Sequence, residues 1–181
     1  MKKILISFLG VFLILTTGCD QIDNNPTKQV EDLMSKYQTM DDDVKDDLNT
    51  VIDTEENLND EQRSRYKKLL EKQYKDLSYT IKDETIDGDN AIVEVEIQVT
   101  DLSKAMSEAE IYLDEHENEF LDDANQFSQE KYTDYKLQKL EEADTKVKYT
   151  LELTLTKVDD EWEVDNLTET ERQKIHGIYN Y

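Results

Sequence analysis

Two segments in which every second residue is apolar constrain the fold of this chain most strongly. Successive side chains of a β-strand point to opposite faces, so each segment predicts a strand with one buried and one solvated face. Asp87 to Asn90 precedes the first segment and Asp159-Asp160 follows the second, and both are turn signals that predict hairpins. The apolar positions are Val93, Val95, Ile97 and Val99 in the first segment, and Val147, Tyr149, Leu151, Leu153 and Leu155 in the second.

The rest of the chain has mainly helical periodicity. Pro26 predicts the start of a first helix with Thr27 as its N-cap. The aspartates at 41–43 favour the start of a second helix, because carboxylates stabilise a helix N-terminus. Asn59 followed by Gln62 resembles a capping box that opens a third helix.

One long helix is predicted between the hairpins, capped by Asp101 or Ser103, and a short helix is predicted over Tyr132 to Glu142. The opposite faces of the long helix are acidic, so packing of its apolar stripe would have to hold it. The stripe is Leu102, Met106, Ala109, Leu113, His116, Phe120, Ala124 and Phe127.

Thr168 with Glu171 is a second capping box, and Gly177 is placed to end the last helix in a left-handed conformation. This order of elements predicts an α+β domain, in which a curved antiparallel sheet of about four strands packs with helices. Residues 27–181 would form this single acidic domain.

The first residues are typical of an export signal. Lys2 and Lys3 precede an apolar stretch, Ile4 to Leu15, that is too short to span a bilayer. Leu15-Thr16-Thr17-Gly18-Cys19 then resembles the bacterial lipobox, although an aliphatic residue is commoner where Thr16 stands. We therefore expect a lipoprotein signal peptide over 1–18, cleavage after Gly18 and a thioether-linked diacylglyceryl group on Cys19. The alternative is an ordinary signal peptide with a stray cysteine.

Residues 19–26 would be the lipidated cysteine and a short polar tether, which at ~3.3–3.6 Å per residue keeps the domain close to the membrane. Similar lipoproteins with an aspartate at the position of Asp20 stay at the cytoplasmic membrane. The expected location is thus the outer face of the cell membrane, with the lipid on Cys19 as the membrane partner. Whether the envelope has one membrane or two stays open.

Three short patterns resemble the nuclear transport factor two-like superfamily, and in particular lipoproteins of Gram-positive bacteria with that fold. They are Asn25-Pro26-Thr27 leading into Val30, Leu33 and Met34, the hairpin from Leu155 to Trp162, and the closing Ile175-His176-Gly177-Ile178-Tyr179. The resemblance implies a cone-shaped domain with a curved sheet around helices. A cystatin-like sheet and helix is the rival, and the extra N-terminal helices and the long central helix depart from the superfamily's plan.

The net charge of -23 disfavours binding to nucleic acid and to anionic lipid headgroups, and favours cations and basic partners. The simplest explanation of this charge is a solvated surface. With two histidines and one cysteine that carries lipid, we expect no metal site and no cofactor. The segment Asp83 to Glu94 partly matches a calcium-binding loop, but a hairpin turn explains it better, leaving at most weak calcium binding at Asp87 and Asp89.

The candidate pocket combines His116, Phe120, Tyr149 and Trp162. A histidine on an apolar helix face is usually a hydrogen-bonded boundary residue, and Trp162 is most simply core packing. His176, near a helix C-terminus where positive charge is mildly favoured, is expected to be structural.

We expect no catalytic residues and a non-enzymatic binding or adaptor module of the cell envelope, with an unknown protein or small-molecule partner. One alternative is a small-molecule carrier or sensor with a pocket near His116 and Trp162. The other is a hydrolase or isomerase that uses His116 as its base. Ligand and oligomeric state stay open.

Overall fold

The computed structural model describes residues 24–55 and 57–180. The predicted signal peptide and the lipidated Cys19 lie outside these residues. No helix in the described part of the chain is long and apolar enough to cross a membrane.

The described residues form an α+β fold with six α-helices and a four-stranded antiparallel sheet in the order β1-β2-β3-β4, so the predicted fold class is confirmed at this level. The strands are β1 (Ser78–Asp87), β2 (Asn90–Thr100), β3 (Lys146–Val158) and β4 (Glu161–Val164). The helices are α1 (Pro26–Thr39), α2 (Asp42–Thr54), α3 (Asp60–Lys75), α4 (Leu102–Glu115), α5 (Gln129–Glu142) and α6 (Glu169–His176), with a 3-10 helix η1 (Glu117–Phe120) after α4.

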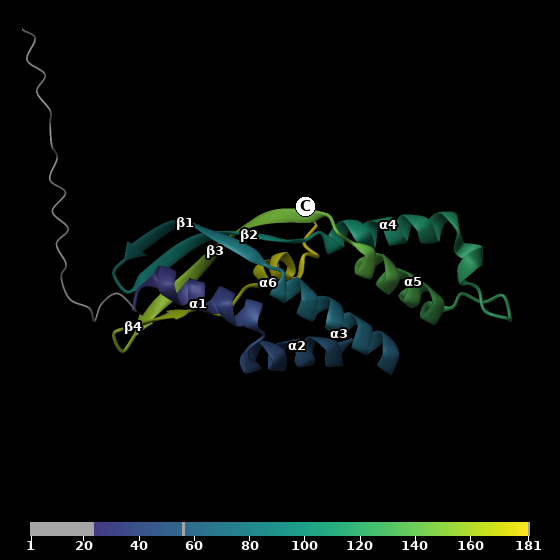
Figure 1. The fold of residues 1–181 in the computed structure, drawn as a ribbon, viewed down its shortest axis with the longest axis horizontal. Helices are drawn as coiled ribbons and strands as arrows, with labels where there is room; N and C mark the ends of the chain where they lie inside the picture. The colour runs from purple at the N-terminus through teal and green to yellow at the C-terminus, as the bar shows by residue number, and fades with distance from the viewer. Residues whose placement is uncertain (1–23, 56, 181) are drawn as a thin grey trace, which may run out of the picture.

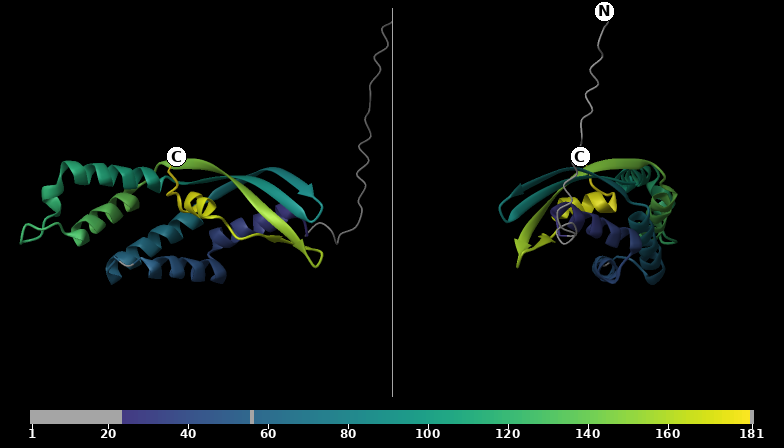
Figure 2. Two further views of the ribbon diagram at one scale, coloured as in Figure 1. Left: turned by 180° about the vertical axis from the view of Figure 1, so that it is seen from behind. Right: turned by 60° about the vertical axis from the view of Figure 1, so that its left-hand side comes forward.

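The two alternating segments pair with each other as β2 and β3, and their apolar side chains form the main core. Val93 lies opposite Leu153, and Val95 lies opposite Leu151, and all four are essentially inaccessible to solvent. Helices α1 and α6 lie under the same face of the curved sheet (Figures 1 and 2). Val30 and Met34 of α1 and Ile175 of α6 contribute to this core.

Helices α4 and α5 extend beyond the sheet as an arm (Figure 1). A second, smaller core holds them together, formed by Leu102, Ala105, Leu137 and Leu140. The arm grows out of β2 and returns into β3, so it is an insertion between the two central strands.

The prediction of one long helix from Leu102 to Phe127 is wrong. Helix α4 ends at Glu115, and the chain turns back through η1 and a loop in which Leu121 pairs with Phe127. The stripe of apolar residues continued past this break because Phe120 folds back to pack edge-on against Tyr112 and Tyr132, with ring centroids 6.3 and 5.6 Å away. Helical spacing alone does not distinguish one long helix from a helix and a turn that share a core.

The predicted helix ends are largely confirmed. Both capping boxes, at Asn59 and at Thr168, are present, and Gly177 has the left-handed conformation with φ 74°. The N-cap of α1 is Asn25, not Thr27, because Pro26 occupies the first helical position. Asp101 is the residue that caps α4.

The calcium-loop-like segment forms the β1–β2 hairpin, as its strand-like flanks indicated. In the part of the chain that the structure describes, no group of three or more His, Cys, Asp or Glu side chains is arranged to hold a metal ion.

Candidate functional site

The four residues of the predicted pocket lie in two separate places. Tyr149 and Trp162 belong to the main core on β3 and β4. His116 and Phe120 lie at the outer end of the arm, where α4 ends, whereas β4 is at the opposite end of the molecule (Figure 1). The structure therefore does not bring His116 and Trp162 together.

Three of these residues make hydrogen bonds or ring contacts that do not involve the other members of the predicted pocket. The His116 ring stacks on Tyr112 with centroids 4.0 Å apart, and its Nδ1 lies 3.1 Å from the Tyr112 carbonyl oxygen. The Trp162 backbone N–H donates to Asn24 Oδ1 at 3.0 Å, and the Tyr149 hydroxyl donates to the Tyr179 carbonyl at 3.0 Å. These contacts agree with the structural alternatives for His116 and Trp162.

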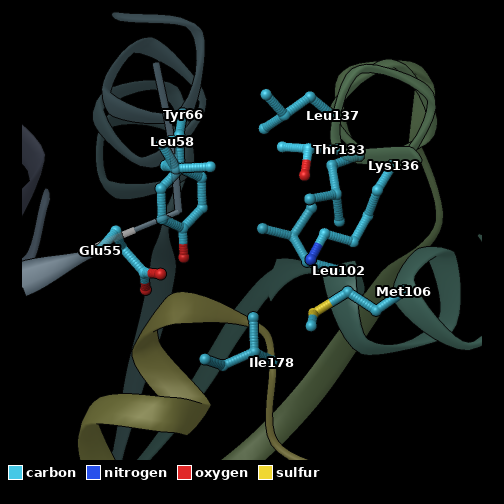
Figure 3. Close-up of a pocket in the computed structure, with 10 residues that line it drawn as sticks. Glu55, Leu58, Tyr66, Leu102, Met106, Thr133, Lys136, Leu137 and Ile178 are labelled. Carbon is cyan, nitrogen blue, oxygen red and sulfur yellow. The ribbon is translucent and has the colours of Figure 1, made fainter. Parts of the chain in front are cut away.

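A different concavity lies where the arm meets the rest of the molecule (Figure 3). We call it the junction groove. Its volume is about 210 Å³, and its walls come from α3 and the loop before it, from α4 and α5, and from the residue after Gly177. The lining residues are Glu55, Leu58, Tyr66, Leu102, Met106, Thr133, Lys136, Leu137, Leu140 and Ile178.

Arg63 holds the loop between α2 and α3, which forms one wall of the junction groove. Its guanidinium donates to three backbone carbonyls, of Ile52, Glu55 and Leu58, at the end of α2 and in the following loop. The Ile52 carbonyl also accepts from the Glu55 N–H at 3.3 Å. The guanidinium thus adds a charged donor to carbonyls at and beyond the end of α2, and it holds Leu58 against the groove.

Polar contacts between α3 and α5 fix the distance between two walls. Gln62, only 1% exposed, donates to the Glu130 carbonyl at 3.2 Å and to Asp134 at 3.0 Å. Arg65 makes two hydrogen bonds of 2.9 Å to the Glu141 carboxylate. This bidentate contact lowers the pKa of Glu141 and raises that of Arg65.

The wall formed by Ile178 depends on a buried hydrogen-bond network at the base of the arm. Gln73 donates to the carbonyls of Thr100 and His176, and its side-chain oxygen accepts from the Thr100 N–H at 3.0 Å. The Gly177 carbonyl accepts from the Ser103 N–H at 2.9 Å. These bonds hold the end of α6, and hence Ile178, at the point where β2 passes into α4.

Most of the lining is apolar, with a few polar groups at its edges. Burial, and to a smaller extent the Glu55 carboxylate, raise the pKa of Tyr66 to about 12, so its hydroxyl is protonated. The ammonium end of Lys136 points into the groove (Figure 3). An apolar concavity with few polar groups is typical of binding sites.

No local pattern in the sequence predicts the junction groove. Its lining comes from five separate segments, and their apolar residues have the same helical spacing as residues that are fully buried. Tyr66, for example, packs on both hydrophobic cores and also lines the groove. No local pattern signals that the two cores leave a gap between them.

The second histidine is buried at the end of α6. His176 Nε2 lies 2.8 Å from the Tyr74 hydroxyl. Burial is the main cause that lowers the pKa of His176 to about 4. The expected structural role fits, but the favourable charge at the helix C-terminus does not apply, because the cost of desolvating a charged imidazole outweighs the helix dipole.

The chain matches no known family model, no curated protein and no solved structure. The chemistry of the site therefore has to be argued from the groove itself. Its lining residues supply apolar contact, hydroxyl and ammonium donors and one carboxylate, and they include no histidine, cysteine or serine.

Proposed function

We propose that this protein is a lipid-anchored binding module on the outer face of the cell membrane, and that the junction groove is where it binds. The observation that carries the proposal is an apolar groove, open to solvent, between two hydrophobic cores. Its apolar walls with a few hydrogen-bonding groups are suited to non-covalent binding. The role is therefore that of a carrier, sensor or adaptor.

The position of Asn24, the first described residue, supports the anchoring part of this proposal. Asn24 donates to the Asp160 carbonyl at 2.8 Å, in the turn between β3 and β4. This turn and the start of α1 lie at one end of the molecule, and the arm lies at the other (Figure 1). A lipid on Cys19 would thus hold the sheet end near the bilayer and leave the arm directed toward the envelope.

For the finer fold, the proposal is a nuclear transport factor two-like or a cystatin-like plan, with α1 lying under a curved antiparallel meander. The α4–α5 arm is an addition to either plan. In this arrangement the groove forms at the base of the arm, not in the sheet's concave face, which the main core fills.

A groove-filling substitution tests the binding proposal. Met106 is partly exposed on the inner side of α4, so Met106→Trp should occupy the groove. Ile111 on the same helix is 56% exposed and does not line the groove, so Ile111→Trp is the matched control. Membrane-purified protein would be analysed by mass spectrometry for co-purified small molecules and proteins at low and high salt.

The proposal expects a molecule that is retained by the wild type and by Ile111→Trp but lost from Met106→Trp. Near-ultraviolet circular dichroism would verify that both variants are folded. If all three proteins retain the same molecules, or none retains any, the groove is not the binding site.

A further inference from the structure

Three of the four polar side chains that line the junction groove can donate hydrogen bonds. The Lys136 ammonium can only donate. The Thr133 hydroxyl accepts from Gln129 at 3.2 Å, which leaves its own proton free to donate. The Tyr66 hydroxyl makes no hydrogen bond to any other described residue. Three donors facing one apolar space favour a ligand group that has acceptors only.

Lys136 is the strongest of these donors. It is half-buried, and no carboxylate in residues 24–55 and 57–180 lies within 4.0 Å of it. Its nearest recorded partner is the ring of Tyr132, with Nζ 5.9 Å from the centroid. By contrast Lys139, on the same helix, pairs with Glu142 at 3.3 Å.

The composition makes the lack of a carboxylate partner among the described residues informative. The chain has 44 Asp and Glu against 21 Lys and Arg, so a lysine has more carboxylates available to it than it can use. A partly desolvated ammonium beside an apolar space gains from a carboxylate that reaches it, because the local dielectric is lower than in water.

The one carboxylate of the lining sets the direction of the ligand. Glu55 is exposed and lies on the wall opposite Lys136 (Figure 3). Its charge repels an anionic group placed on that side, so the anion belongs at α5, beside Lys136 and Thr133. The net charge of -23 acts over longer distances, where salt screens it beyond ~8–10 Å.

From this arrangement we infer that the groove binds small monocarboxylates, with the carboxylate on Lys136 and an apolar body against Leu102, Met106 and Ile178. The inference rests on the proposed binding function and names the class of ligand. The volume of about 210 Å³ is below the ~300–1,000 Å³ of pockets for drug-sized ligands. A chain of a few carbons is therefore the appropriate size.

A pair of probes that differ only in the head group tests this. Hexanoate and hexan-1-ol would be titrated by equilibrium dialysis against the full-length lipidated protein in nanodiscs, with empty nanodiscs subtracted. We expect hexanoate to bind about tenfold more tightly than hexan-1-ol, as a charge-assisted hydrogen bond allows. Lys136→Met should abolish this preference and leave hexan-1-ol unchanged, whereas Lys139→Met should behave as wild type.

A second variant covers the case in which Lys136→Met does not fold. Glu55→Gln removes the opposing charge at an exposed position, so it should tighten hexanoate and leave hexan-1-ol unchanged. Equal binding of the two probes in every variant would overturn the inference, because Lys136 would then merely cover apolar surface. The proposed function would survive that result if Met106→Trp removed the binding of both probes. No binding of hexanoate to the wild type would overturn the carboxylate inference, while the co-purification experiment would still decide the proposed function.

Discussion

The buried His176 predicts a specific loss of stability in mild acid. Its pKa falls from 6.5 to about 4 on folding. Between these two values the unfolded chain binds a proton that the native protein does not, so the free energy of unfolding decreases as the pH falls. The difference of about 2.5 pH units corresponds to about 3 kcal/mol. This contribution is complete above pH 6.5 and is lost progressively down to about pH 4.

The substitution His176→Gln isolates this effect from the many carboxylates that titrate in the same range. Urea denaturation of both proteins at several values between pH 7.5 and 4.5 would give the free energies of unfolding. The difference between wild type and variant should shift by about 2 to 3 kcal/mol in favour of the variant as the pH is lowered. A difference that stays constant with pH would refute the reasoning.

The comparison with Tyr74 tests the cause. Burial is the largest cause of the lowered pKa of His176. Of its charged neighbours, Glu169 raises this pKa and Arg172 lowers it. Tyr74→Phe should therefore lower stability at every pH but keep the same dependence on pH as the wild type. If Tyr74→Phe removed the dependence, the hydrogen bond and not burial would be responsible.

Four further substitutions, one of them a control in the β1–β2 turn, test the base of the arm and the anchor. A Cβ on Gly177 would lie 2.2 Å from the Thr100 carbonyl oxygen, so Gly177→Ala should lower the free energy of unfolding by more than about 2 kcal/mol. Gly88 also has a positive φ but has open space around it, so Gly88→Ala should lower the free energy of unfolding by only about 1 kcal/mol. Gln73→Leu should cost about 2–4 kcal/mol, because it leaves the buried N–H and C=O of Thr100 without their side-chain partner. Urea denaturation would measure the stability of the Gly177, Gly88 and Gln73 variants. Cys19→Ser should release the protein from the membrane fraction, which immunoblotting of cell fractions would show, and unchanged fractionation would contradict lipid anchoring.

Local patterns predicted the elements whose cause is local. The alternation in β2 and β3 and the capping boxes at Asn59 and Thr168 depend only on residues close together in the sequence, and the structure confirms them. The break after Glu115 could not be predicted in this way, because it depends on Phe120 packing against α5, which is distant in the sequence.

The candidate site depended even more on tertiary structure. The predicted pocket combined His116 with Trp162, but His116 follows α4 at the outer end of the arm and Trp162 lies on β4 at the other end of the molecule. The junction groove arises where the second core of the arm meets the main core, and its shape depends on long-range contacts such as that between Gln62 and Asp134. Those contacts have no signature in either segment alone.

The central claim is that the junction groove binds a small monocarboxylate, and methyl NMR tests it most directly. Spectra of the labelled methyl groups of Met106, Leu137 and Ile178 would be recorded while hexanoate is added, with Ile86 and Ile111 as exposed references outside the groove. We predict saturable shifts confined to the three groove residues. Shifts of equal size at the exposed isoleucines, or no shifts in the groove, would contradict the claim.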